Sequence, residues 1–129
     1  MFLVKVSIRQ SAIHGLGCFA EEDIKKGQLV WQFDPRMDLQ FTEEDITQLP
    51  PPAVDFLHRY GYCENRQQGR VIILCGDFGR HLNHAEDFNL LEAGAAKEFN
   101  IAARDIRKGE ELTCNYYDFD DDVVRKLGR

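Results

Sequence analysis

Short stretches of alternating hydrophobic and polar residues open the chain. Residues 2–8 alternate and predict a β-strand, and the turn-forming residues 11–17 lead from it into a second strand at 18–20. A Lys-Lys-Gly turn at 25–27 precedes residues 28–33, which are apolar and aromatic enough for a buried strand. The chain is therefore predicted to begin as strands joined by turns.

The middle of the chain carries the signals of two short helices. Thr42 and Asp45 have the spacing of a capping box, which starts a helix that must end before the prolines at 50–52. Proline favours the first turn of the next helix, and apolar residues fall near helical spacing within 53–60. Gly61 is placed to cap the C-terminus of this second helix.

Strand patterns return in the second half of the chain. Residues 70–75 form a β-branched run, and residues 97–103 and 110–116 predict two further strands separated by the segment 104–109. The acidic segment 118–129 has too few apolar residues to predict an element, and we interpret it as a solvated tail. The whole pattern predicts many short strands and two short helices.

Length and composition are those of one small globular domain. The chain has 129 residues, 43% of them hydrophobic and 29% charged, so a single domain over 1–129 has enough apolar residues for a core. The opening segment lacks the continuous apolar run of a secretory signal, and a cytoplasmic protein is expected. The net charge of −6 disfavours direct binding to nucleic acid but is compatible with a basic peptide.

Cysteine and histidine spacing favours neither a disulfide framework nor a metal site. His81 and His84 are closely spaced, but a structural zinc site usually needs two such pairs, so no metal is predicted. A metal-binding regulator that uses these histidines and the cysteines stays open as an alternative. Free thiols are expected at the four scattered cysteines: Cys18, Cys63, Cys75 and Cys114.

Two groups of residues suggest chemistry. The Gly-x-Gly at 15–17 lacks the third glycine and the following helix of a dinucleotide-binding motif, but it lets a ligand lie against the backbone. Asn83, His84 and Asn89 lie within seven residues of one another, and buried amides and imidazoles are costly unless they are paired. By composition alone, these three form either an internal hydrogen-bond network or a site for a polar ligand.

Three segments together resemble the SET-domain family of protein lysine methyltransferases. Residues 15–17 resemble the family's N-terminal Gly-x-Gly, and residues 80–89 resemble its Arg-Phe-x-Asn-His-Ser-Cys-x-Pro-Asn motif. Residues 109–116 resemble its Gly-Glu-Glu-Leu-x-x-Asp-Tyr motif. The resemblance covers about residues 5–118 and is greatest to the compact bacterial and viral members that lack flanking domains.

The resemblance implies a mainly β SET-domain (β-clip) fold, with small curved sheets around a C-terminal pseudoknot. It also implies methyl transfer from S-adenosylmethionine to a lysine amine, with Tyr116 as the catalytic residue and Asn89 bracing the crossing of the two C-terminal motifs. The resemblance implies that the cofactor is bound by positions that match the family's motifs and by the backbone of the Gly-x-Gly: Leu16, Gly17, Arg80, Asn83, His84 and Tyr116.

Methyl transfer to an amine is an in-line displacement that depends on orientation in a narrow apolar channel. The residues expected to line this channel are Tyr62, Phe88, Cys114 and Phe119. Cys114 stands where the family generally has Phe or Tyr, so the number of methyl groups added is not predictable. The expected partner is a protein or peptide with a lysine in a basic context, and a homodimer could complete the channel.

The motifs also depart from the family pattern. The differences lie next to the predicted cofactor and active-site residues: Ala85, Glu86, Phe88 and Asn115. They leave open a second reading, in which the chain is a catalytically weak or inactive SET-fold interaction module. Tyr116 argues against that reading.

Overall fold

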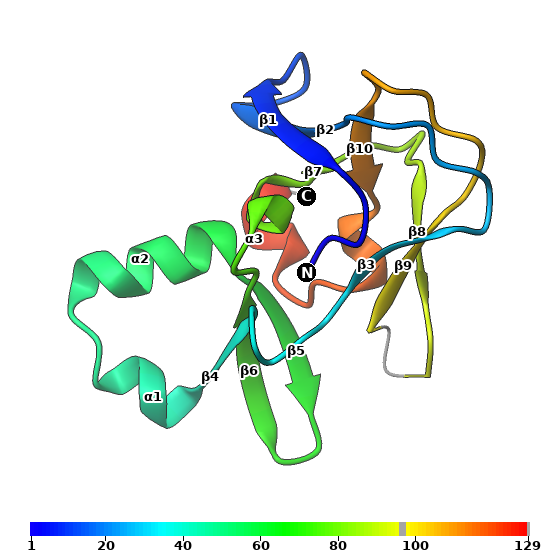
Figure 1. Cartoon of the computed structure of the whole chain (residues 1–129). Coiled ribbons are helices and arrows are strands. Elements are labelled where there is room, and N and C mark those ends of the chain that lie inside the picture. The colour runs from blue at the N-terminus through cyan, green and yellow to red at the C-terminus, as the bar shows by residue number, and fades with distance from the viewer. Residues whose placement is uncertain (96–97, 129) are drawn as a thin grey trace.

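The fold is built from short strands arranged in three small sheets (Figure 1). The computed structural model describes residues 1–95 and 98–128. The strands are β1 (Val6–Gln10), β2 (Leu16–Ala20), β3 (Leu29–Gln32), β4 (Leu39–Thr42), β5 (Tyr62–Arg66), β6 (Gly69–Leu74), β7 (Asn83–His84), β8 (Leu90–Ala93), β9 (Phe99–Ala102) and β10 (Glu111–Cys114). The helices are α1 (Glu43–Thr47), α2 (Pro51–Tyr60) and α3 (Val123–Leu127), with 3₁₀ turns η1 (Phe78–His81) and η2 (Tyr116–Asp118). The predicted mainly β architecture of small sheets is observed.

The first sheet has the strand order β1-β2-β10-β7 and joins both ends of the chain. β1 and β2 form the antiparallel hairpin predicted from the alternation. The prediction that the first strand spans residues 2–8 is wrong at its start, because Phe2 forms an isolated bridge with Trp31 and the Leu3 N–H donates to Val30 O (2.8 Å). The first residues therefore run beside β3, and the hairpin begins only at Val6.

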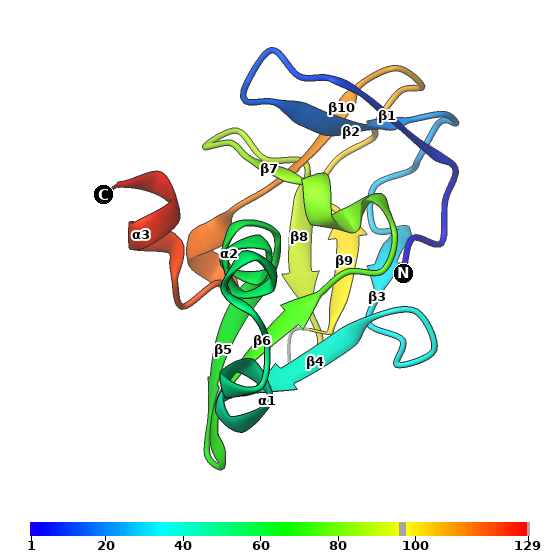
Figure 2. The ribbon, with the colours of Figure 1, turned by 90° about the vertical axis from the view of Figure 1, so that its left-hand side faces the viewer.

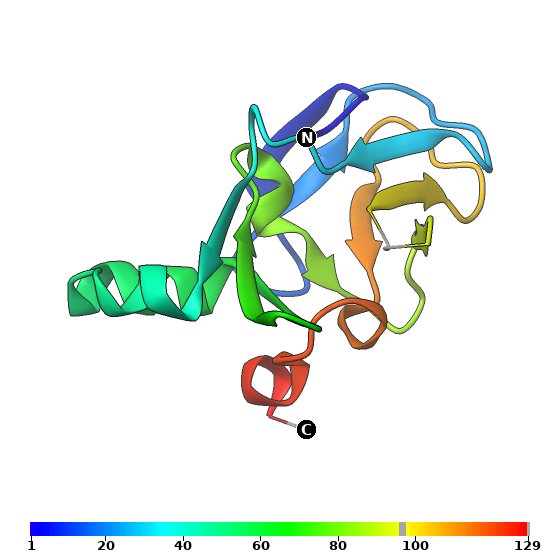
Figure 3. The same cartoon turned by 90° about the horizontal axis from the view of Figure 1, so that it is seen from below.

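The other two sheets have the orders β3-β9-β8 and β4-β6-β5. α1 and α2 lie beside the β4-β6-β5 sheet (Figure 2) and project to one side of the molecule (Figures 1 and 3). The capping box is confirmed, since the Asp45 N–H donates to Thr42 Oγ1 (3.1 Å) and the Thr42 N–H donates to Asp45 Oδ2 (2.9 Å). These contacts are local, which explains why the sequence predicts them.

Gly61 caps α2 as predicted, and its N–H donates to Leu57 O (2.8 Å). The glycine is required by close packing, not by a left-handed backbone, because its φ is −81°. A Cβ at this position would lie 2.6 Å from Ile72 Cγ2 and 2.8 Å from Leu57 O. The absence of a side chain thus brings the end of α2 against β6.

Two apolar clusters form the core. The larger one includes side chains from β2, β3, β8, β9 and β10 and from the isolated bridge between Ile24 and Ile106: Cys18, Ala20, Ile24, Val30, Leu90, Ala102, Ile106, Leu112 and Cys114. The smaller one lies where α2 meets the β4-β6-β5 sheet: Leu57, Cys63, Ile72 and Leu74. All four cysteines are buried and free, as expected for thiols without a disulfide framework.

The C-terminal part differs from the expectation in two places. β10 ends at Cys114, so Tyr116 does not end a strand but begins η2. The segment 118–129 contains α3 and the buried Asp120, so it is not a solvated tail. The strand predicted at 97–103 is observed as the shorter β9. Residue 97 of that prediction and residue 129 of the predicted tail lie outside the described residues. No helix within the described ranges is long and apolar enough to cross a membrane.

Candidate active site

The two C-terminal motifs meet where β7 pairs with β10. The pair is parallel, with Thr113 opposite Asn83 and Cys114 opposite His84. The side chain of Asn89 extends this contact, since its Nδ2 donates to Glu111 O (2.8 Å) and its Oδ1 accepts from the Thr113 N–H (2.8 Å). Asn89 therefore bonds to β10 as a neighbouring strand would, in agreement with the bracing role expected for it.

Asn83 connects this crossing to the Gly-x-Gly loop between β1 and β2. Its Nδ2 lies within hydrogen-bond distance of His14 O (3.0 Å), Leu16 O (3.1 Å) and Glu111 Oε1 (3.0 Å). Asn83 is buried, with 7% of its surface exposed. Its amide thus fixes the loop against β10, which places both His14 and Asn83 on the same cavity wall.

Glu111, which the sequence did not predict as part of the site, completes this connection. Its Oε2 accepts from Ser11 Oγ (3.0 Å) while its Oε1 accepts from Asn83. A Cβ on Gly17 would lie 2.0 Å from Glu111 Oε1, so the second glycine of the Gly-x-Gly makes room for this carboxylate. The position of Glu111 within the Gly-Glu-Glu motif is the feature of the sequence that could have indicated this role.

Tyr116 is held by two contacts near the crossing. Its N–H donates to His84 Nδ1 (3.1 Å), and its hydroxyl donates to the main-chain carbonyl of Leu82. Burial raises the pKa of Tyr116, and its ring lies 5.5 Å from the His84 ring. The phenol is therefore neutral at physiological pH and held in one direction. It can position a polar group but is a poor source of a phenolate.

A cavity of about 1150 Å³ lies between these segments and the helices α2 and α3. Seven of the predicted site residues line it: Tyr62, Arg80, Asn83, His84, Cys114, Tyr116 and Phe119. Leu16, Gly17 and Phe88 are not among the lining residues. Gly17 lies against Glu111, and the Phe88 carbonyl, in the turn before β8, accepts from Arg104 (3.0 Å). Leu16 contributes its carbonyl to Asn83 instead.

Aromatic rings form one part of the cavity wall. The Tyr62 and Phe119 rings meet edge to face at 5.2 Å, and the Phe119 and Tyr116 rings lie 5.8 Å apart. Burial raises the pKa of Tyr62, so this phenol is also neutral at physiological pH. Cys114 lies at the same wall with a thiol whose pKa burial raises well above its usual value. This part of the cavity is therefore aromatic and without a thiolate.

The C-terminal helix α3 contributes a lysine to the cavity wall. Lys126 Nζ forms an ion pair with Asp120 Oδ2 (2.6 Å), donates to Gly61 O and lies 5.9 Å from the centre of the Tyr116 ring. Asp120 is 3% exposed and also accepts from the Cys63 N–H (3.0 Å). These buried contacts hold α3 against β5. Nothing in the sequence indicated these contacts, because Asp120 belongs to a run of three aspartates at 120–122.

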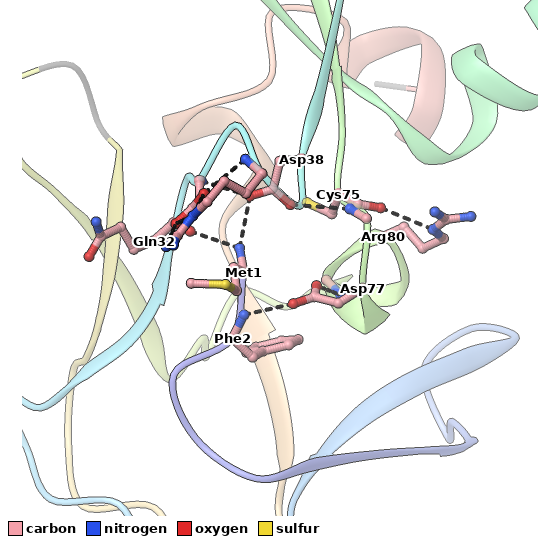
Figure 4. A network of polar contacts seen from close by, with 11 residues as sticks. Met1, Phe2, Gln32, Asp38, Cys75, Asp77 and Arg80 are labelled. Carbon is pink, nitrogen blue, oxygen red and sulfur yellow. Dashed lines mark hydrogen bonds and ion pairs between the residues drawn. The ribbon is translucent and has the colours of Figure 1, made fainter.

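Arg80 reaches the cavity from η1, which is held in place by a polar network (Figure 4). Its Nε donates to Cys75 O (3.1 Å), and its guanidinium carbon lies 5.5 Å from the centre of the Phe56 ring. The buried Asp38 accepts from the Gly76 N–H (3.1 Å) and from the Met1 ammonium (3.0 Å), while Asp77 accepts from the Phe2 N–H (2.7 Å). The network ties the segment before η1 to the first residues of the chain.

Within residues 1–95 and 98–128, no group of three or more His, Cys, Asp or Glu side chains is arranged to hold a metal ion. The residues considered for a metal make other contacts. His81 meets the Tyr60 ring edge to face at 5.4 Å, and Cys63 Sγ accepts from Arg70 (3.1 Å).

Asn115, a departure from the family motif, accepts from the Tyr117 N–H (3.2 Å) and caps η2. Asparagine can fill this capping role as aspartate does.

Comparison with known proteins identifies the family. The SET domain model matches residues 15–117. No curated protein matches the chain by sequence. Among solved structures, a Plasmodium falciparum protein described as a candidate histone methyltransferase has a TM-score of 0.59 and 23% identity, covering 88% of this chain and 93% of its own.

Two structures of Polycomb Repressive Complex 2 from Chaetomium thermophilum are also similar. One, in an autoinhibited conformation bound to S-adenosylmethionine, has a TM-score of 0.67 and 24% identity over 97% of this chain and 16% of that chain. Another, in complex with methylated and mutant forms of histone H3, has a TM-score of 0.63 and 25% identity over 88% and 14%.

The chain thus spans about a sixth of the length of the Chaetomium thermophilum proteins that it matches. At these identities, the structural likeness establishes the fold. The family model covers most of the chain and includes all three motifs, although it begins at residue 15, whereas the resemblance was expected from about residue 5. The chain therefore belongs to the SET-domain family, whose members are typically S-adenosylmethionine-dependent lysine methyltransferases.

Proposed function

We propose that this protein transfers a methyl group from S-adenosylmethionine to the side-chain amine of a lysine in a protein or peptide. One observation carries the proposal: the residues of the two C-terminal motifs, Arg80, Asn83, His84 and Tyr116, line a single cavity within a SET fold. The aromatic residues Tyr62 and Phe119 line the same cavity. This one cavity could therefore contain both the cofactor pocket and the lysine channel.

The cavity wall suits the chemical groups of S-adenosylmethionine. Arg59 and Arg80 can bind its carboxylate, while Asp55 and main-chain carbonyls can accept from its ammonium. Aromatic side chains next to His84 can stack against its purine. When bound, this cofactor supplies an electrophilic methyl group on a sulfonium. His84, Asn83 and Arg80 are the residues that we expect to hold it.

The side chains around Tyr116 would prepare the lysine amine. An amine must lose its proton before it can act as a nucleophile, and burial between aromatic rings favours the neutral form. The neutral phenol of Tyr116 can orient the amine, and the Leu82 carbonyl fixes that phenol. Most of the rate enhancement would then come from orientation and from exclusion of water.

The substrate is proposed to be a lysine in a basic sequence. The chain carries a net charge of −6, which attracts a positively charged peptide over a range limited by salt. Asp121 is exposed and follows the cavity-lining Asp120, so we propose that it contributes to this attraction, whereas Asp120 itself is buried and paired with Lys126. We also propose that the protein is cytoplasmic and that it forms a homodimer. Light scattering after size exclusion tests the dimer.

Two measurements test the proposed function. Calorimetry with S-adenosylmethionine or its demethylated product should show one binding site per chain, and Asn83→Ala should weaken binding at least about tenfold by releasing the Gly-x-Gly loop. Asn65→Ala, at an exposed strand end, is the matched control and should bind normally. Labelled cofactor in a cell lysate, followed by mass spectrometry, should then identify methylated lysines. A protein that binds neither form of the cofactor would contradict the proposal.

A further inference from the structure

The C-terminal segment 120–127, which we call the strap, lies along the outer edge of β5. β5 pairs with β6 on one side only, so its other edge is of the kind that bonds to an extended chain. This edge is occupied, because the Cys63 N–H donates to Asp120 Oδ1 (3.0 Å) and the Cys63 carbonyl accepts from the Asp121 N–H (2.9 Å). The Asn65 N–H donates to Asp121 Oδ2 (2.6 Å). Two aspartates thus bond to three main-chain groups of β5 where a neighbouring strand would.

The strap also bounds one end of the cavity. Asp120, Lys126 and Leu127 line the cavity together with Tyr116. The Lys126 ammonium donates to the Gly61 carbonyl, at the end of α2, and pairs with Asp120, whose side chain is 1% exposed. The strap therefore joins α2 to the edge of β5 at this end of the cavity. An extended peptide that bonded to β5 and reached Tyr116 would meet the strap on its way.

Polar contacts hold the strap, with little help from apolar burial. Among the described residues of α3, Val123 alone is buried, whereas Val124 is 61% exposed. Asp122 and Arg70 add an ion pair at 3.4 Å, but the arginine is 39% exposed and such pairs stabilise little. Segments with few buried apolar side chains open at a lower free-energy cost than the core. The strap can therefore open while the two apolar clusters stay packed.

An extended peptide could take over the bonds that the strap makes to β5. Each peptide residue offers a main-chain N–H and a carbonyl, which can satisfy the same groups of Cys63 and Asn65. Because Cys63 is buried, leaving its N–H and carbonyl without partners would be costly. The strap and a peptide are thus alternative occupants of one edge, and the edge is bonded with either.

We propose that the strap is an autoinhibitory segment, which occupies the edge of β5 until an extended peptide displaces it and reaches Tyr116. Only molecules with an open strap bind the peptide, so the apparent affinity is reduced by the open fraction. Weakening the strap then strengthens peptide binding, whereas loosening a purely structural segment would not. The inference rests on the proposed function for its peptide, but the displacement can be measured without methyl transfer.

Two variants break the same ion pair and change the net charge in opposite directions. Lys126→Met removes a positive charge, and Asp120→Asn removes a negative one. Fluorescein-labelled decalysine is the probe, and fluorescence anisotropy measures its affinity for the full chain. We expect both variants to bind it at least about fivefold more tightly than the wild type. Attraction by charge alone would strengthen binding to Lys126→Met and weaken binding to Asp120→Asn.

Arg66→Met and Glu64→Gln are the matched controls, because they break a more exposed ion pair of β5 and make the same two changes in charge. Both should stay within about twofold of the wild-type affinity. If the affinity fails to rise in either variant of the Lys126–Asp120 pair that folds, the inference is overturned.

Amide exchange in the wild type, followed by NMR, is a second test that needs no variant. Saturating decalysine should speed exchange of the Asp121 N–H at least about tenfold, because this N–H loses the Cys63 carbonyl. The Cys63 and Asn65 amides should stay protected, since the peptide replaces their partners. Unchanged or slower exchange at Asp121, or no binding of decalysine to any of these proteins, would overturn the inference. Absence of cofactor binding on the same samples, with the strap displaced as expected, would count against the proposed function alone.

Discussion

The hydroxyl of Tyr116 donates to the main-chain carbonyl of Leu82, two residues after Arg80. This bond joins the catalytic candidate to the segment that carries the cofactor-binding candidates. It also gives the phenol a fixed direction inside an aromatic wall, with a pKa that burial raises. Removing the hydroxyl therefore tests positioning without altering the ring.

We expect Tyr116→Phe to lower the rate of methyl transfer at least about a hundredfold, because the amine loses the group that orients it. Cofactor affinity should change less than about threefold. The unpaired Leu82 carbonyl should lower the free energy of unfolding by about 1 kcal/mol. Single-turnover rates, calorimetry and urea denaturation measure these three quantities. Tyr117→Phe, at an exposed ring, is the control. A Tyr116→Phe protein with normal rates would exclude this role.

Asn89 should be the more important residue for stability. Asn89→Ala leaves the Glu111 carbonyl and the Thr113 N–H without their side-chain partners. Because unpaired buried groups each cost about 1–3 kcal/mol, we expect a loss of about 3 kcal/mol in the free energy of unfolding. Urea denaturation measures it, with Asn65→Ala as the matched control. A loss equal to that of the control would show that Asn89 does not brace the crossing.

The Lys126–Asp120 pair should hold α3 in place. Breaking a buried ion pair from one side is costly, so Lys126→Met and Asp120→Asn should each destabilise the protein by about 3 kcal/mol. The double variant should lose less than the sum, since neither charge is then left unpaired. Arg66→Met, which breaks the more exposed pair with Glu64, should cost less than about 0.5 kcal/mol. Strictly additive losses in the double variant would disprove the coupling.

The cysteines should be unreactive in the folded protein. Burial raises the pKa of Cys18 and of Cys75 to about 12, and that of Cys114 well above its usual value. Because the thiolate is the reactive form, a disulfide reagent at pH 8 should label no cysteine rapidly. All four should react once urea has unfolded the chain. Rapid labelling of one thiol under native conditions would identify a site where the folded chain opens.

The sequence predicted features that depend on neighbouring residues. The Thr42–Asp45 capping box and the Gly61 cap involve contacts within four residues, so their chemistry is visible in the local pattern. The family resemblance supplied the fold and placed Asn83 and Tyr116 in one site. Neither the local caps nor the motif matches required knowledge of which strands pair or in what register.

Features that depend on distant residues were not predictable. β7 is only two residues long, and it is a strand because β10 lies beside it. Trp31, Asn100 and Glu92 are neighbours across the β3-β9-β8 sheet because of the registers of two strand pairs, which no local pattern fixes. Similarly, nothing in the acidic run distinguished Asp120 from its exposed neighbour Asp121, because burial follows from the docking of α3.

The reach of the Asn83 side chain has a consequence for the order of folding. Asn83 contacts His14, which is 69 residues away, and Glu111, which is 28 residues away. Contacts between distant segments form slowly, since long loops must close before they stabilise the chain. We therefore expect no partly folded intermediate to bind the cofactor. The cofactor should therefore slow the unfolding of the native protein. The folding rate should be the same with and without the cofactor.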